Sequence, residues 1–152
     1  MPNLSRSVPL LAQSDRADCL PACVEMVLAS FGRHVERDWL KQVLETTSLG
    51  MPGFKLLNLR AHGYEVTYAA AMNERPLTEA LSNDIPPIAL VYTTGLPYWI
   101  RETAHAVVVV EFGDRVMLHD PAFAEQPQIV SRDAFMLAWS DFDYLYTVIS
   151  PA

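Results

Sequence analysis

Cys19 has the clearest potential for nucleophilic chemistry in this sequence of 152 residues. It follows Asp18 at the start of an apolar segment with helical spacing, so its sulfur is expected in the first turn of a helix. Free N–H groups and the helix dipole favour a thiolate there, which is the reactive form of cysteine. Asp18 opposes this effect unless its carboxylate caps the helix. Cys19 is therefore a candidate nucleophile, with a small core residue as the alternative interpretation.

The other cysteine, Cys23, lies one helical turn further along, on the apolar face. Buried structural thiols are inert, so we expect Cys23 to pack in the core. A disulfide with Cys19 would close a very small loop, and the two Cα atoms would lie near the outer limit for bridging. The sequence therefore predicts no disulfide, and it leaves two alternatives: both cysteines pack in the core, or one of them is a reactive thiol.

Of the four histidines, His105 has the most apolar surroundings in the sequence, so its side chain most needs a polar partner. It opens AHAVVVVEF, the most apolar strand-like run of the chain. His34 follows Gly32 by two residues and His62 precedes Gly63, both at predicted helix ends, where a cation is favourable and exposure is normal. His105 is therefore the candidate general base.

A predicted hairpin offers Asp120 as the partner of His105. If Gly113-Asp114 forms a two-residue turn, Phe112 faces Arg115, and the numbers of paired residues sum to 227. His105 and Asp120 then lie on one face as diagonal neighbours, about 7–8 Å apart at Cα. A three-residue turn would shift the register and break this relation. A purely structural hydrogen bond between the two side chains fits the same geometry.

A cysteine at a helix start, with a histidine oriented by a carboxylate, is the arrangement of an activated nucleophile. The imidazole of His105 would take the thiol proton of Cys19, and Asp120 would hold the imidazole in the required tautomer. The backbone N–H of Cys19 is one donor for an oxyanion. The side-chain amide of Gln13 is a candidate for the second, although a glutamine before a helix is usually solvated surface.

A metal site is the minor alternative for the same side chains. Cys19, His105, His119 and Asp120 are possible ligands, but neither a C-x2-C nor an H-x3-H spacing is present. The hairpin also places His119 on the face opposite Asp120. We therefore expect neither a metal nor another cofactor.

Composition limits the partners of the protein. Its length suits a single domain, residues 1–152, and 51% of its residues are apolar. The net charge of −7 repels phosphate backbones, which argues against nucleic acid. No apolar run approaches the roughly 20 residues needed for membrane insertion, and MPNLSRSVPLLAQSDR is not a secretory signal. We expect a cytoplasmic domain.

Helices dominate the first half of the chain and strands the second, which predicts an α+β fold with N-terminal helices packed on a mostly antiparallel sheet. Within the loop at 94–103, Tyr98 and Trp99 could line a substrate groove or fill the edge of the core. The helices are expected at 19–31, 36–46, 54–62, 76–82 and 131–139, and the strands at 64–69, 88–93, 104–112, 115–119 and 144–149.

Three blocks of the sequence resemble those of the C39-type cysteine peptidases, papain-like enzymes known as the leader-cleaving domains of bacteriocin exporters. QSDRADCLPACVEMVLASFG resembles the family's N-terminal block, and AHAVVVVEFGDRVMLHDPAF its histidine strand and Asp-Pro strand end. SRDAFMLAWSDF resembles the short helix that follows. The resemblance runs from about Leu11 to Ile149, with Gln, Cys, His and Asp-Pro at spacings of 6, 86 and 15.

The resemblance implies a papain-like fold in which Cys19 is the nucleophile and His105 the general base. It also implies that Asp120 orients the histidine and that Gln13 contributes to the oxyanion hole. One departure is Leu20-Pro21, because the family usually has glycine after the catalytic cysteine. The sequence also lacks an exporter's membrane and ATPase domains, so a double-glycine leader does not follow as the substrate.

Three functions remain open at this stage. The first is a cysteine peptidase acting on a peptide or protein substrate, for example in processing a leader or a peptide tag. The second is another papain-like acyl transfer, such as removal of a protein modifier, amide hydrolysis or transamidation. The third is a non-catalytic module that binds peptides. Association with an exporter or a modifier system is not readable from the sequence.

Overall fold

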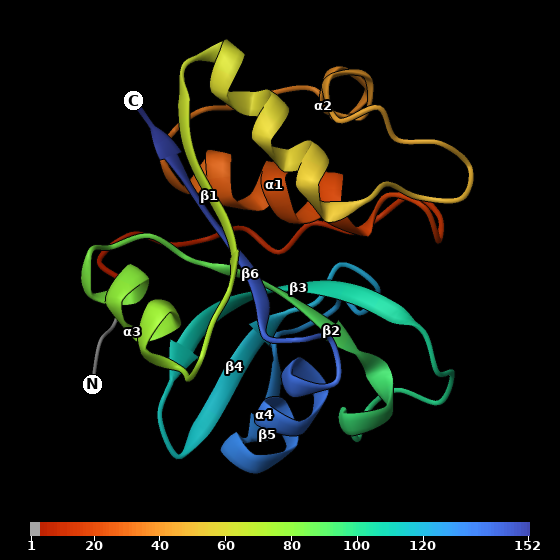
Figure 1. The fold of residues 1–152 in the computed structure, drawn as a ribbon, viewed down its shortest axis with the longest axis vertical. Coiled ribbons are helices and arrows are strands. Elements are labelled where there is room, and N and C mark those ends of the chain that lie inside the picture. Colours follow the sequence, from red (N-terminus) through yellow and green to blue (C-terminus); the bar gives the residue numbers. More distant parts are fainter. Residues whose placement is uncertain (1–3) are drawn as a thin grey trace.

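The computed structural model describes residues 4–152 and contains the predicted helices and strands, with three helical segments before the first strand and later helices between strands (Figure 1). The third predicted helix is a 3-10 helix, and one short strand, β5, was not predicted. The elements are α1 (Cys19–Ser30), α2 (Arg37–Val43), η1 (Gly53–His62), β1 (Tyr64–Ala70), α3 (Arg75–Ser82), β2 (Ile88–Tyr92), η2 (Thr93–Gly95), β3 (Ala104–Phe112), β4 (Arg115–His119), β5 (Gln128–Ser131), α4 (Arg132–Ser140) and β6 (Leu145–Pro151).

The strands form one six-stranded sheet in the order β1-β6-β2-β3-β4-β5, with antiparallel pairing throughout. The last strand in the chain, β6, therefore lies between β1 and β2. This arrangement confirms the predicted α+β class and antiparallel sheet. No helix among residues 4–152 is long and apolar enough to span a bilayer.

Strand β3 is buried on both faces, which explains its unbroken apolar run. Val108 and Val110 pack in the cluster that contains the apolar residues of α1. Val107 and Val109 point the other way, into the cluster that contains Phe135 and other residues of α4. In Figure 1, α1 and η1 lie above β3 and α4 lies below it. The two layers hold the first residues of β3 against the start of α1.

The start of α1 differs from the prediction in one respect. Asp18 occupies the N-cap position, but its carboxylate makes no capping hydrogen bond to the helix. It instead accepts the backbone N–H groups of Ser14 and Asp15, at 2.9 and 3.1 Å, and pairs with Arg37 at 2.9 Å. The preceding loop folds back over the fully buried carboxylate. Asp18 thus fixes the loop that leads to Cys19.

The predicted turn between β3 and β4 is wrong, although the register beyond it is right. Phe112 pairs with Val116 instead of Arg115, so the turn is one residue longer than predicted. A β-bulge between Val109 and Glu111 absorbs the extra residue. Val108 consequently faces His119, as the predicted register requires. The bulge restores the relation between the far ends of the two strands, where His105 and Asp120 lie.

Candidate active site

Cys19 and His105 line the same surface groove, although they lie 86 positions apart in the sequence. Cys19 is the first residue of α1, and His105 is the second residue of β3. The groove has a volume of about 280 Å³, and its walls include the segment 49–53 and Phe142. Cys19 is partly exposed there. A substrate in this groove can therefore reach both the thiol and the imidazole.

His105 and Asp120 form a short, buried pair. The Nε2 atom of His105 lies 2.6 Å from Oδ1 of Asp120, and their side chains are 3% and 0% exposed. Because Nε2 is occupied, Nδ1 is the ring nitrogen left to serve Cys19. Burial lowers the pKa of His105, but the hydrogen bond to Asp120 and the interaction with Cys19 raise it, to about 9 overall. At neutral pH the ring therefore carries both protons.

Asp120 accepts hydrogen bonds on both of its oxygens. Oδ1 also accepts the backbone N–H of Ala122 at 2.9 Å. Oδ2 accepts the hydroxyl of Tyr98 at 2.7 Å and the indole N–H of Trp99 at 2.9 Å. Burial raises the pKa of Asp120, but these hydrogen bonds, above all that of His105, hold it below its ordinary value. Asp120 is therefore a carboxylate at neutral pH.

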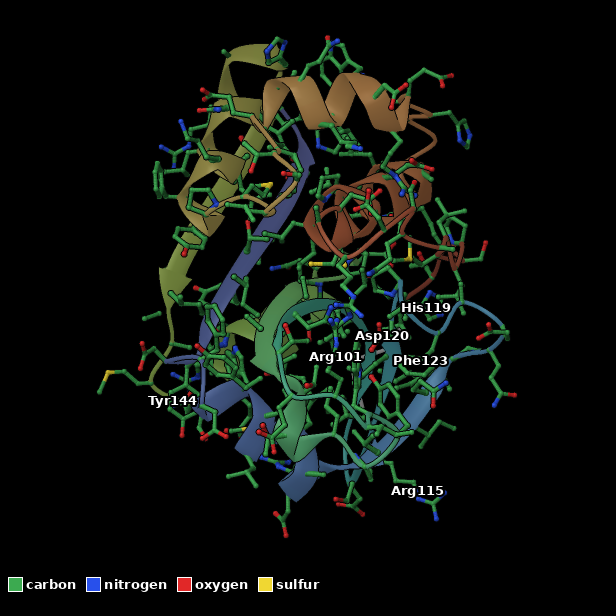
Figure 2. All side chains as sticks on the ribbon, turned by 90° about the vertical axis from the view of Figure 1, so that its right-hand side faces the viewer. Arg101, Arg115, His119, Asp120, Phe123 and Tyr144 are labelled. Carbon is green, nitrogen blue, oxygen red and sulfur yellow. The ribbon has the colours of Figure 1, made fainter. Side chains whose placement is uncertain are left out.

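The contacts of Tyr98 and Trp99 with Asp120 are the part of the site that sequence reasoning missed. Their loop precedes His105, and both side chains turn inward to the carboxylate instead of lining the groove. Figure 2 shows Asp120 with His119 and Phe123 near one end of β4, and Arg115 at the other end. Two adjacent aromatic residues with N–H and O–H donors, just before the histidine strand, are the signal that could have indicated this role.

Gln13 is anchored near Asp120, but its side chain does not face the groove. Its backbone N–H donates to the carbonyl of Pro121 at 2.9 Å. Its Nε2 donates to the carbonyl of Asp15 at 2.8 Å, and its Oε1 is buried without a hydrogen-bond partner. Gln13 is also absent from the groove lining. The contact with Asp15 uses one of the two N–H donors of the amide.

The remaining reactive side chains lie away from the groove. Cys23 is fully buried, and its thiol donates to the carbonyl of Ala106 at 3.5 Å. Burial raises the pKa of Cys23 well above its ordinary value, so it stays a neutral core thiol. His34 and His62 are exposed, and His119 is buried beside β3 with Nδ1 unpartnered. Within residues 4–152, no group of three potential ligands has metal-site geometry.

A model of the peptidase C39 family matches residues 7–148, nearly the whole chain. The chain belongs to the peptidase C39 family. This C39 chain is also 28% identical, over 120 residues, to the colicin V secretion/processing ATP-binding protein CvaB of Escherichia coli. The match covers 77% of the C39 chain and 15% of CvaB. The chain therefore spans about a seventh of this relative's length.

Solved structures match the C39 chain over almost its entire length. The peptidase domain of Streptococcus ComA, a bi-functional ABC transporter, has a TM-score of 0.75 at 20% identity and covers 96% of this chain and 100% of its own. A double glycine motif protease from an AMS/PCAT transporter, solved with its leader peptide, has a TM-score of 0.73 at 18% identity, with 98% and 97% covered. The papain-like fold is thereby confirmed, and the protein is a cysteine peptidase of the C39 family.

Proposed function

We propose that this C39 peptidase hydrolyses an amide bond of a peptide or protein substrate by using Cys19, His105 and Asp120. The observation that carries the proposal is the buried His105–Asp120 pair, whose imidazole lines the same groove as the partly exposed Cys19 thiol. Cys19 is the nucleophile, His105 transfers protons, and Asp120 orients the ring and balances its charge. We assign the whole chain to this one domain.

Acylation begins when the Cys19 sulfur attacks the carbonyl carbon, with its proton held by Nδ1 of His105. The C–N bond breaks as His105 gives this proton to the leaving amine, and a thioester remains on Cys19. Water then attacks the thioester while His105 takes one of its protons. The C–S bond breaks, the acid product leaves, and the proton taken from water stays on Nδ1 of His105, as at the start of the cycle.

Oxyanion stabilisation is assigned to the backbone N–H of Cys19 and to the amide of Gln13. The first turn of α1 leaves N–H groups without helical partners, and Pro21 has none to offer. Gln13 would contribute through the second N–H of its amide, since the first donates to the carbonyl of Asp15. Its backbone anchor at Pro121, next to Asp120, supports this assignment because it holds Gln13 close to the site.

Two relatives support a proposal for the substrate class. One structural neighbour was solved with a leader peptide, and CvaB is a secretion/processing protein. We infer that the protein cleaves a leader or tag from a longer peptide, and that it works in the reducing cytoplasm, where Cys19 remains a free thiol. Leu20, which lines the groove beside Cys19, is the observation that favours the alternative of another acyl transfer.

The Cys19→Ala variant, used as a trap in a lysate, distinguishes these substrates. A captured precursor peptide with a double-glycine leader supports leader processing. A captured conjugate of a protein modifier supports the alternative. If the variant and a Cys19→Ala/His105→Ala double variant both capture nothing, the proposed peptide substrate is contradicted.

Iodoacetamide is expected to alkylate Cys19 at least about 100 times faster than Cys23 at neutral pH. Cys19 is partly exposed beside a protonated imidazole, whereas Cys23 is buried and its pKa is raised. Peptide mapping by mass spectrometry, at several reaction times, measures the two rates. Equal and slow labelling of both cysteines would contradict an activated thiol.

Raising the pH is expected to remove the stabilisation that His105 gives to the folded state. The pKa of His105 is about 9 in the folded protein against an ordinary value of 6.5, so its contribution is complete below 6.5 and disappears as the pH rises through 9. A rise of that size corresponds to roughly 3 kcal/mol. The measurement is the difference in free energy of unfolding by urea between wild type and His105→Gln, at about pH 6, 8 and 10.

The matched control for this experiment is His34→Gln, because His34 is exposed. Its difference from wild type is expected to stay below about 0.5 kcal/mol throughout. A gap between wild type and His105→Gln that stays constant across the pH range would show that the folded state does not hold the His105 proton.

A further inference from the structure

The loop between β2 and β3 is closed at its base by Thr93. The backbone N–H of Thr93 donates to the carbonyl of Thr103 at 3.0 Å, and the backbone N–H of Thr103 donates to Oγ1 of Thr93 at 2.9 Å. The Thr93 hydroxyl also donates to the carbonyl of Arg101 at 2.6 Å. The two ends of the loop are thereby tied together. Tyr98 and Trp99 project from a loop of fixed shape.

The aromatic rings of this loop cover the His105–Asp120 pair. The Trp99 ring packs edge-on against the His105 ring, with centroids 4.7 Å apart. Phe123 packs edge-on against both Tyr98 and Trp99, at 5.1 Å in each case. This cover keeps water from the pair, and water exclusion makes a charged carboxylate costly unless protein donors replace the lost hydration.

Oδ2 of Asp120 receives two donors that His105 does not require. Oδ1 alone accepts the imidazole, so the ring could be oriented without Tyr98 or Trp99. Burial favours a neutral pair in which the shared proton moves to the carboxylate, because that transfer removes two buried charges. Hydrogen bonds to Oδ2 oppose the transfer, since they stabilise the ionised form more than the neutral acid.

We propose that Tyr98 and Trp99 are positioning residues that keep Asp120 ionised and aligned with His105, so that the imidazole retains its proton for the leaving group. The proposal deepens the proposed function and rests on it for the catalytic meaning. Both donors suit this role: the Trp99 indole only donates, and burial together with the Asp120 charge raises the pKa of Tyr98. Both groups therefore keep their own protons and do not transfer them to Asp120.

The other titratable groups around Asp120 come from two elements. Burial is the main cause of the high pKa of Cys23, and the charge of Asp120 raises it further, so the Cys23 thiol of α1 lies near the carboxylate. His105 faces it from β3. Tyr98 and Trp99 are the donors that can be removed singly while Cys19, Cys23, His105 and Asp120 all stay in place.

The test uses Tyr98→Phe and Trp99→Phe, each of which keeps an aromatic ring and loses one donor. The ring C–H signals of His105, followed by NMR from acid to alkaline pH, report two titrations of the pair. The acid-side titration is the protonation of Asp120, and the alkaline-side titration is the deprotonation of His105. Loss of a donor destabilises every state in which Asp120 is ionised, so the acid-side midpoint should rise by about one pH unit per donor. The alkaline-side midpoint should stay within roughly 0.3 units, because Asp120 is ionised on both sides of it.

Catalysis supplies the second measurement for the same variants. Each single variant is expected to lower kcat roughly tenfold and to change KM less than about twofold, because neither residue lines the groove. The matched control is Tyr144→Phe, whose ring packs on Trp139 and which Figure 2 shows well away from Asp120. That variant should match the wild type in both measurements.

Two results would overturn the proposal. The first is an acid-side midpoint that is unchanged in both variants, and the second is an equal shift of both midpoints, which marks a packing effect alone. The proposed function fails separately: the wild type would then cleave no peptide and alkylate no faster at Cys19 than at Cys23. The NMR titration decides the role of the two donors in that case as well, since it needs no substrate.

Discussion

Replacing Cys19 by alanine is expected to lower kcat for peptide hydrolysis by at least about a thousandfold, to the background rate. Without the sulfur no thioester forms, and the His105–Asp120 pair alone activates no nucleophile of the chain. Cys19 is only partly buried at the first position of α1, so the loss of one sulfur atom should change the free energy of unfolding by less than about 1 kcal/mol. The measurements are steady-state kinetics and unfolding by urea.

Cys23→Ala is the matched control and should show the opposite pattern. Cys23 is fully buried, so its removal leaves a small cavity and is expected to destabilise the fold by about 1–2 kcal/mol. Its kcat should stay within about twofold of the wild type, because the sulfur lies outside the groove. Activity that survives in Cys19→Ala and disappears in Cys23→Ala would refute the assignment of the nucleophile.

Arg37→Ala is expected to reduce the free energy of unfolding by about 3 kcal/mol. The Asp18 side chain is 0% exposed, and the guanidinium of Arg37 pairs with it at 2.9 Å. Arg37 also binds Glu25 at 2.8 Å and the carbonyl of Ala12 at 3.0 Å. Truncation leaves a buried carboxylate without its counter-charge and frees the loop before Cys19. Unfolding by urea at neutral pH measures the loss.

The exposed pair of Arg75 and Glu79 provides the control for this prediction. Their side chains are 80% and 67% exposed, and the charged atoms lie 3.8 Å apart. Arg75→Ala should therefore cost less than about 0.5 kcal/mol. Burial opposes ionisation of Asp18, but backbone hydrogen bonds and Arg37 hold its pKa below 3.8, so the cost of Arg37→Ala should shrink as the pH falls through that range. Equal losses in the two arginine variants would contradict the prediction.

Local patterns predicted the elements well because each has a distinct hydrophobic period. β3 and α1 are apolar enough, and sufficiently bounded by glycine or polar residues, to be placed within a residue or two. The order of the sheet has no such local signal, since β6 pairs with strands that precede it by many residues. β5 has only four residues at the sheet edge, too few for its alternation to be recognised.

The positions of the candidate site residues were predictable where the residue type suited the chemistry and the strand register placed it correctly. The positions of Cys19, His105 and Asp120 follow from a helix start and two strand ends. The turn after Phe112 was predicted one residue too short, and only the bulge in β3 preserved the relation of His105 to Asp120. The remaining contacts of the site depend on the path of the loop between β2 and β3. Sequence alone does not show that Tyr98 and Trp99 fold inward.

The orientation of the Gln13 amide was equally beyond the sequence. A carbonyl two residues away, on Asp15, offers a local partner that takes one of the two amide donors. The orientation of the amide depends on the shape of the loop around Asp18, and no pattern in the sequence predicts that shape.

The place of β6 in the sheet has a consequence during synthesis on the ribosome. A nascent chain that has emerged up to about residue 140 holds Cys19, His105 and Asp120, yet it lacks the strand that joins β1 to β2. Ile149 of that strand also packs in the cluster that anchors α1. Proteolytic capacity should therefore appear abruptly, only once residues 145–151 have left the exit tunnel, and an unfinished polypeptide stays harmless to its neighbours.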